Sequence, residues 1–453
     1  MAKEKIQKTN KKVAKKTRRV EPTLPGGFRD YGPSDAIARS QMIEIIRKTF
    51  ENFGFDPMET ASIQRKNVLF GGEKESEKIV FDVKGSREKK SDTALRFDLT
   101  VPFARFMAAN PEIPKPFKRY QIGTVWRGES PQAGRYREFM QADIDIIGSS
   151  SVNADAEVIA MIYQTLKNLG IDDFVIKVNN RKLLTVLPKL CKFSESKLGI
   201  VLGLIDKIDK IGEKQIFDIL KKEIGAVSVA SLRELMSAIG TGRDISQISL
   251  NGKMITSLAE EGTRELWQIN AALELFGLKR GKYWQFNPLT VRGLSYYTGM
   301  IFETFLTKAP EMGSIFSGGR YDELLIPFTG QKIPAVGASV GIDRLFAALE
   351  KLNVVKKQVT LTRVLVLNLS SELKSEYLAM VKQLREAKIN TSFYLGDDTS
   401  FQAQFSYAVK KEIPFVVILG EEEKKKGVIA IKNLKTREQK EIKRKDFVAF
   451  FKK

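Results

Sequence analysis

The chain has 453 residues, of which 43% are hydrophobic and 28% charged, and it carries a net charge of +21, one cysteine and no histidine. This composition is ordinary for a globular protein of two or three domains, and it excludes an internal disulfide and a cysteine-cluster metal site. It also excludes Ser–His and Cys–His nucleophile pairs and histidine-bound metals, so catalysis has to depend on carboxylates, Lys, Tyr, Arg, backbone dipoles or another bound metal.

Residues 1–21 are predicted to form a disordered basic arm. Residues 1–19 contain seven Lys, two Arg and one Glu, with almost no apolar side chains. The remainder still carries +13 of the total charge of +21, which favours a polyanionic partner such as nucleic acid, although a lysine-rich solvated surface is the alternative. No apolar run approaches the roughly 18 residues of a membrane span, and the N-terminus lacks the apolar core of a signal peptide. We therefore expect a cytoplasmic protein that does not enter a membrane.

The first large unit is predicted to mix strands with helices. Apolar residues at helical spacing indicate a helix over residues 36–53, which Ser34 or Asp35 could cap. Residues 55–147 are typical of strands and hairpins. A helix at 152–169 and a strand at 173–180 follow, and repeated helical periods over residues 181–280 indicate a helical insertion.

A domain boundary is predicted near residues 352–363. Beyond it, strands alternate with helices at 371–388 and 401–412, and a hairpin precedes the basic end of the chain. This alternation is typical of a compact α/β domain. The sequence thus divides into units at 22–355 and 360–453.

Four stretches of the larger unit carry candidate functional residues. In "LRFDLTVPFARF", residues 95–106, Arg96 and Asp98 alternate with apolar residues. We expect a half-buried strand that ends at Thr100 and Pro102, and the alternative is a solvated strand face.

The second stretch is "TVWRGESPQAGRYREFMQADIDIIG", residues 124–148. Arg127 and Glu129 share one face at period two, and Gln141, Asp143 and Asp145 share a face opposite apolar residues. Guanidinium groups fit phosphate oxygens in bidentate geometry. The carboxylates instead need a cationic or N–H-bearing group, such as an amino acid offers. Cross-strand ion pairs on an exposed sheet are the alternative.

The other two stretches combine glycine with aromatic or cationic residues. "VRGLSYYTGMIFE", residues 291–303, places Arg292 and Tyr297 among glycines, as in a wall for a small planar ligand or in a core strand with stacked aromatics. In "VGASVGIDRLFAALE", residues 336–350, a small-residue strand runs into a helix whose first turn carries Arg344. That arrangement favours an anion. "GSIFSGGRYDELL", residues 313–325, adds a glycine turn with Arg320.

In this order, the stretches resemble the motifs of class II aminoacyl-tRNA synthetases, and most closely those of the histidyl-tRNA synthetase family. "PGGFRDYGP", "SGGRYDELL", "VGASVGIDRL" and the C-terminal "PFVVILGEEE" extend the resemblance over residues 22–453. It implies an α+β fold with an antiparallel sheet flanked by helices, a helical insertion at about 181–280 and a C-terminal α/β anticodon-binding domain. It also implies a homodimer with the helix at 36–53 near the interface.

The resemblance implies ligation of L-histidine to tRNA-His with ATP and Mg²⁺. Arg127 is similar to the arginine that binds the α-phosphate, Glu129 to the residue that accepts from the adenine amino group, and Arg344 to the arginine on the γ-phosphate. Arg292 corresponds to the family's catalytic arginine, which contacts the substrate carboxylate and the α-phosphate.

The same resemblance implies a histidine pocket. Asp98, Thr100 and Gln141 correspond to residues that contact the α-amino group, and Asp145 and Tyr297 to those that read the imidazole. A non-catalytic paralogue, the regulatory subunit of ATP phosphoribosyltransferase, is one alternative, and an RNA-binding protein without chemistry is another. The intact set of Arg127, Glu129, Arg292 and Arg344 argues against both, and the C-terminal domain also argues against the paralogue.

Overall fold

The computed structural model describes residues 20–70, 79–87, 90–129, 136–240, 248–250, 253–254, 257, 259–291 and 297–452. The basic arm at 1–19 and Arg292 lie outside these residues. An eight-stranded sheet organises the larger unit, in the order β1-β5-β6-β13-β12-β11-β7-β10. Its strands are β1 (Asp56–Pro57), β5 (Phe117–Trp126), β6 (Glu138–Ile147), β7 (Phe174–Asn180), β10 (Trp284–Phe286), β11 (Met300–Leu306), β12 (Ser314–Arg320) and β13 (Ala335–Gly341).

The sheet is antiparallel through its six central strands, while β1 and β10 add to its edges in parallel. The expected α+β fold is confirmed, with these parallel edge strands as a refinement. The β5–β6 hairpin pairs Trp126 with Glu138 and Arg119 with Asp145. Alternation along β6 sends apolar side chains to one face, where Ala142, Ile144 and Ile146 join the main core.

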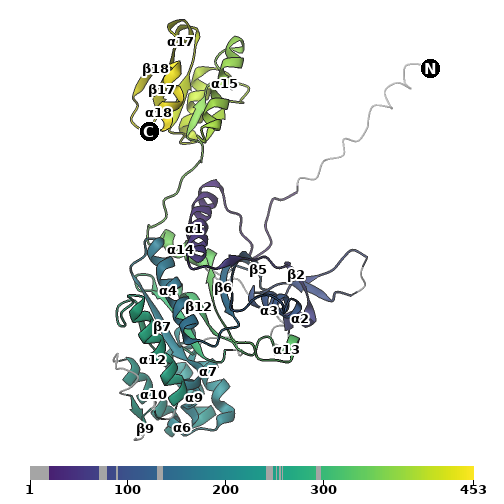
Figure 1. Cartoon of the computed structure of the whole chain (residues 1–453), viewed down its shortest axis with the longest axis vertical. Helices are drawn as coiled ribbons and strands as arrows, with labels where there is room; N and C mark the ends of the chain where they lie inside the picture. The colour runs from purple at the N-terminus through teal and green to yellow at the C-terminus, as the bar shows by residue number, and fades with distance from the viewer. Residues whose placement is uncertain are drawn as a thin grey trace, which may run out of the picture.

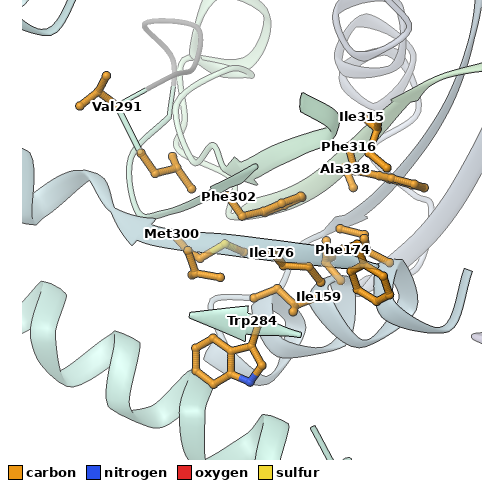
Figure 2. Packing of buried hydrophobic residues seen from close by; sticks show 14 of the residues in the cluster. Ile159, Phe174, Ile176, Trp284, Val291, Met300, Phe302, Ile315, Phe316 and Ala338 are labelled. Carbon is orange, nitrogen blue, oxygen red and sulfur yellow. The ribbon is translucent and has the colours of Figure 1, made fainter. Parts of the chain in front are cut away.

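Long helices cover that apolar face. They are α1 (Pro33–Asn52), α4 (Val152–Asn168), α12 (Glu260–Leu275) and α14 (Ile342–Lys351). α1 and α12 both pack on α4 (Figure 1). Figure 2 shows the core between them and the sheet, with Ile159 of α4, Ile176 of β7 and Trp284 of β10 in one cluster. The prediction that Ser34 or Asp35 caps α1 is wrong, because the helix starts at Pro33 and Gly32 is its N-cap.

The stretch at 95–106 is not a strand. Only β4 (Thr93–Leu95) is extended, in a small sheet with β2 (Ile63–Arg65) and β3 (Asp82–Val83), and α2 (Lys66–Phe70) lies beside it. The chain then buries residues 96–99 and turns into α3 (Thr100–Ala109). Tertiary packing outweighs local alternation here, because both the apolar and the polar side chains of 96–99 are buried.

A group of helices and two short strands fills the region predicted as an insertion. They are α5 (Arg181–Leu184), α6 (Leu187–Cys191), η2 (Glu195–Lys197), α7 (Leu198–Ile205), α8 (Ile208–Ile211), α9 (Glu213–Ile224) and α10 (Ala226–Gly240), with the strands β8 (Ser249–Leu250) and β9 (Lys253–Met254). They gather at one end of the large sheet, at the bottom of Figure 1. The short η4 (Pro310–Met312) and α13 (Ile326–Thr329) flank β12 in the chain.

The C-terminal unit has a sheet and core of its own. Its strands run in the order β15-β14-β16-β17-β18. They are β14 (Val364–Val366), β15 (Thr391–Phe393), β16 (Phe415–Ile418), β17 (Val428–Asn433) and β18 (Gln439–Lys443), joined by η5 (Ser371–Leu373), α15 (Lys374–Glu386), α16 (Phe401–Lys410), α17 (Glu421–Lys426), η6 (Arg444–Asp446) and α18 (Phe447–Lys452). The helices predicted at 371–388 and 401–412 are confirmed within two residues, as η5 followed by α15 and as α16.

None of the helices described in the chain is both long and apolar enough to cross a membrane.

Candidate active site

A cavity of about 770 Å³ lies over the polar face of the large sheet. Eight of the nine residues to which the family resemblance gives a role line it, and the ninth, Arg292, falls outside the described residues. The eight are Asp98, Thr100, Arg127, Glu129, Gln141, Asp145, Tyr297 and Arg344. Residues that lie more than 240 positions apart in the sequence therefore line one cavity.

Asp145 is fixed at the floor of the cavity. Its side chain is 2% exposed, forms an ion pair with Arg119 and accepts a hydrogen bond from the Tyr321 hydroxyl. Gly337, opposite on β13, leaves room for it, because a Cβ there would lie 2.1 Å from Asp145 Oδ1. Burial raises the pKa of Asp145 to about 6, and Arg119 opposes this shift.

A second glycine makes room for Tyr297. A Cβ on Gly319 would lie 3.0 Å from Cδ1 of the Tyr297 ring. Beside Tyr297, the backbone N–H of Thr298 donates to the carbonyl oxygen of Arg320 at 2.8 Å, and its hydroxyl donates to Asp322 at 2.9 Å. These bonds attach the Tyr297 segment to β12.

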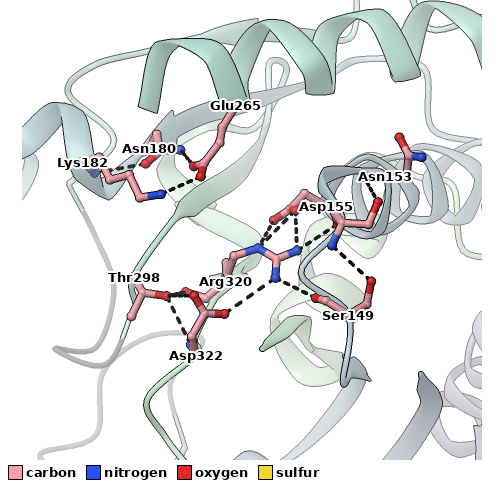
Figure 3. A network of polar contacts seen from close by, with 10 residues as sticks. Ser149, Asn153, Asp155, Asn180, Lys182, Glu265, Thr298, Arg320 and Asp322 are labelled. Carbon is pink, nitrogen blue, oxygen red and sulfur yellow. Dashed lines mark hydrogen bonds and ion pairs between the residues drawn. The ribbon is translucent and has the colours of Figure 1, made fainter. Parts of the chain in front are cut away.

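Arg320 in turn anchors that strand to α4 (Figure 3). Its Nη2 donates to Asp155 Oδ2 at 2.6 Å and its Nε donates to Oδ1 at 3.1 Å. Its remaining donors bond to the carbonyl oxygens of Ser149 and Ser151 at 2.9 and 3.1 Å. The network is buried, so it fixes the position of the cavity wall.

Asp98 and Arg127 are both held by backbone groups at the start of α3 or just before it. Asp98 Oδ1 accepts from the backbone N–H of Val101 at 3.1 Å, in the first turn of the helix. Arg127 donates through Nε to the carbonyl oxygen of Phe97 at 3.0 Å, and its guanidinium lies 5.2 Å from the centre of the Phe139 ring. Among the described residues, no group accepts a hydrogen bond from the two terminal nitrogens of Arg127, which leaves them available to an anion.

The start of α14 supplies the other cation. Arg344 Nη1 donates to the carbonyl oxygen of Ser314 at 2.8 Å. The neighbouring Asp343 accepts from Arg39 of α1 at 2.7 Å and from the backbone N–H of Met140 at 2.7 Å. One acidic side chain therefore joins α1, β6 and α14 next to the cavity.

Three buried carboxylates share the cavity floor. Burial raises the pKa of Asp98 to about 6 and that of Asp143 to about 7, as it does for Asp145. The Asp98 carboxylate raises the pKa of both of the others. Perturbed acids gathered in one cavity are typical of a binding or catalytic site.

Comparison with known proteins gives the family. The model of the histidyl-tRNA synthetase family matches residues 27–345, and that of the anticodon-binding domain matches residues 363–453. The chain belongs to the histidyl-tRNA synthetase family. It is 38% identical over 423 residues to the histidine–tRNA ligase of Helicobacter hepaticus, covering 92% of this chain and 95% of that protein.

Solved structures of this family have the same architecture. The chain is similar to a crystal structure of histidyl-tRNA synthetase from Nostoc, with a TM-score of 0.81 and 31% identity over 96% of this chain and 99% of that one. A Bacillus halodurans structure named as an ATP phosphoribosyltransferase regulatory subunit/histidyl-tRNA synthetase has a TM-score of 0.69, covers 86% of this chain and 97% of that chain, and is 22% identical. That likeness shows the fold alone.

Two residues of this synthetase-family site were not predicted from its sequence. Arg119 was not considered, although hairpin pairing places it opposite Asp145. Tyr321 lies in a stretch that was singled out only for its glycines and Arg320. Both become visible once the register of β5, β6, β12 and β13 is known.

Members of this family use ATP, typically with Mg²⁺. The described residues contain no cluster of three or more acidic or cysteine side chains that could hold a metal alone. Mg²⁺ needs only one or two carboxylates when phosphate oxygens and water complete its shell. Glu303, which lines the cavity and is paired with Ser317 of β12, supplies one carboxylate in the lining.

Proposed function

We propose that the chain is a histidine–tRNA ligase that activates L-histidine with ATP and transfers it to the 3′ end of tRNA-His. The observation that carries this proposal is a cavity lined by both guanidinium groups and buried carboxylates. The guanidinium groups suit a nucleotide's phosphates, and the carboxylates suit the polar groups of a small amino acid.

The first reaction needs no general base. The ionised carboxylate of histidine attacks the α-phosphorus of ATP, a bond forms between the carboxylate oxygen and phosphorus, and pyrophosphate leaves with the bridging oxygen. Charge builds up on the phosphate oxygens, and fixed cations stabilise it. A chain without histidine can perform this chemistry, because positioning and charge stabilisation suffice.

In this proposal the nucleotide lies against Arg127, Glu129 and Arg344. The terminal nitrogens of Arg127 bind the α-phosphate, and the Phe97 carbonyl holds the guanidinium in place for that contact. Glu129 accepts from the adenine amino group, and Arg344 binds the γ-phosphate. Mg²⁺, when bound, would neutralise phosphate charge. Arg292 contacts the reacting carboxylate and the α-phosphate.

The histidine lies beside the buried carboxylates. Asp98, Thr100 and Gln141 hold its α-amino group. Asp145 accepts from the imidazole N–H, and Tyr297 serves the other ring nitrogen. The Arg119 ion pair supports this role, because it favours the ionised, accepting form of Asp145. Fixed buried partners of this kind reject analogues that lack the matching groups.

In the second reaction a ribose hydroxyl of the terminal adenosine of tRNA attacks the carbonyl carbon of histidyl-adenylate. An ester forms, the hydroxyl proton is released and AMP leaves. The C-terminal unit carries 19 Lys and Arg against 12 Asp and Glu over residues 361–453, and we propose that it binds the anticodon stem. We also propose the domain division at 1–21, 22–355 and 360–453, a homodimer and a cytoplasmic location.

The test is histidine-dependent exchange between ATP and pyrophosphate. We expect activity in the wild type and a loss of about 10²-fold or more in Arg292→Ala with the fold intact, since a fixed donor to the reacting charge is worth roughly that much. Arg65→Ala, which changes an arginine whose side chain is 74% exposed, is the matched control. A wild type without exchange activity refutes the proposal in favour of the non-catalytic paralogue, and an Arg292→Ala variant as fast as wild type refutes only the role of that residue.

A further inference from the structure

Asp143 is a buried carboxylate on the cavity floor that has no role in the function proposed above. Its side chain is 2% exposed, and its Oδ1 atom has no hydrogen-bond partner. It lies between Gln141 and Asp145 on the polar face of β6 and lines the same cavity. A buried acceptor without a donor is costly, so a group that enters the cavity is expected to satisfy it.

Ser339, opposite on β13, lowers the pKa of Asp143 through a side-chain hydrogen bond, but the Oδ1 atom still has no partner among the described residues. The polar groups that face it come from its own strand, from β13, from β5 and from the segment before α3, and they are Gln141, Asp145, Ser339, Gln121 and Asp98. Two buried guanidinium groups lie near it. Arg119 is paired with Asp145, and Arg96 donates to the carbonyl oxygens of Thr124 and Thr60 at 2.9 and 2.7 Å.

Among the described residues of the cavity lining, four acceptor atoms are buried without a hydrogen bond, and one of them, Asp145 Oδ2, has the ion pair with Arg119 instead. Asp143 Oδ1 is one of the other three. Asp98 Oδ2 and Gln141 Oε1 are also buried without a hydrogen-bond partner. An ammonium group has three N–H donors and no acceptor, which matches three acceptor oxygens. The described residues of the cavity floor do not form a group that could hold a metal ion, so an ammonium is the better fit.

We propose that Asp143 is a direct ligand of the α-ammonium group of the amino-acid substrate and binds it together with Asp98, Thr100 and Gln141. The inference rests on the proposed function, because histidine is the ligand that brings an ammonium into this cavity. Charged hydrogen bonds of this kind are among the stronger ones in proteins. Asp143 thus selects for a free amino group.

Two histidine analogues separate this role from a structural one. Histidinol keeps the ammonium and lacks the carboxylate, whereas imidazolepropionate keeps the carboxylate and lacks the ammonium. Asp143→Asn, which preserves shape and removes the charge, should weaken histidinol binding at least tenfold and leave imidazolepropionate binding within twofold of wild type. Calorimetry on the full chain gives both constants without turnover. Glu138→Gln, the same change at an exposed position of the same strand, is the matched control and should change neither.

Each outcome has one meaning. Unchanged histidinol binding in Asp143→Asn overturns the inference, and equal weakening of both analogues shows that the residue is structural. If the wild type binds neither histidine nor histidinol, the proposed function fails instead.

A second measurement uses only the wild-type chain, in case the variant does not fold. Burial raises the pKa of Asp143 to about 7, and the ammonium prefers its ionised form. The ammonium of histidinol lowers its imidazole pKa relative to that of imidazolepropionate, so each affinity is first referred to the neutral-imidazole form of its ligand. The corrected preference for histidinol over imidazolepropionate should then rise between pH 6 and 8. A ratio that stays constant over this range contradicts the inference.

Discussion

Arg320 of β12 and Asp155 of α4 form a bidentate ion pair that is nearly closed to solvent, with exposed side-chain fractions of 9% and 2%. The pair holds the cavity wall rather than the substrate, because Arg320 also carries the Thr298 segment through its backbone oxygen. Tyr297 is the residue before Thr298, so the pair couples α4 to the part of the site proposed to read the imidazole.

Replacing Asp155 by Asn should therefore affect both stability and histidine binding. Breaking a buried ion pair from one side costs about 3–5 kcal/mol, and the remaining amide oxygen places the expected loss near the lower value. We expect urea unfolding to show this loss, and KM for histidine to rise more than KM for ATP. Glu323→Gln removes the exposed Lys332–Glu323 pair and should leave the free energy of unfolding nearly unchanged, because solvent screens such a pair. Equal losses in the two variants would contradict the assignment.

Gly337→Ala should disturb Asp145 directly. The new Cβ would lie 2.1 Å from Asp145 Oδ1 and 2.7 Å from the carbonyl oxygen of Ile144, so one of them has to move. Overpacking of this kind costs about 1–3 kcal/mol, and we expect a raised KM for histidine in pyrophosphate exchange. Gly26→Ala is the control, since no atom lies within 4 Å of its added Cβ. If both variants retain the wild-type KM, Asp145 does not bind the substrate as proposed.

The buried acids should lower the free energy of unfolding as pH rises, whereas carboxylates in ion pairs usually have the opposite effect. The pKa of Asp143 rises from its ordinary 3.8 to about 7 on folding because of burial, so the folded chain binds more protons than the unfolded chain between those values. This contribution to the free energy of unfolding falls as pH rises through that window, by at most about 1.4 kcal/mol per pH unit. Asp143→Asn should therefore gain stability relative to wild type between pH 4.5 and 7.5, as measured by urea unfolding without substrates. A difference that is independent of pH would show that Asp143 is not desolvated.

The basic arm should contribute to tRNA binding through charge alone. Residues 1–19 carry a net charge of +8, and each phosphate contact that is lost reduces the dependence of log affinity on log salt by about 0.7–0.9. We expect a chain that starts at residue 20 to bind tRNA more weakly at low salt and with a shallower salt slope. Pyrophosphate exchange, which needs no tRNA, should stay at the wild-type rate. An unchanged slope would exclude the arm from the interface.

Local periodicity predicted the long elements well. The helix expected at 36–53 is Pro33–Asn52, and the one at 152–169 is Val152–Asn168. The alternation that put Gln141, Asp143 and Asp145 on one face also agrees with the cavity lining. Strong period-two and helical patterns survive because one face of each element is buried.

Strand pairing and long-range packing explain which features were not predicted from the sequence. Residues 96–99 alternate in polarity yet are all buried. Hydrogen bonds join them to Arg119, Thr124 and Arg127 of the neighbouring hairpin. Nothing near Arg119 in the chain marks it as the partner of Asp145, 26 positions away, until the hairpin register is known. The roles of the cavity residues remain predictions that kinetics have to test.

The alternation of β6 has a consequence for how this site can evolve. One strand presents its acids and amide to the cavity and its alanine and isoleucines to the core. Deletion of a single residue within this strand would point the acidic side chains into the hydrophobic core and the isoleucines toward the ligand. The same strand therefore determines both substrate recognition and core packing. Natural variation in β6 should consist of substitutions, not of insertions or deletions.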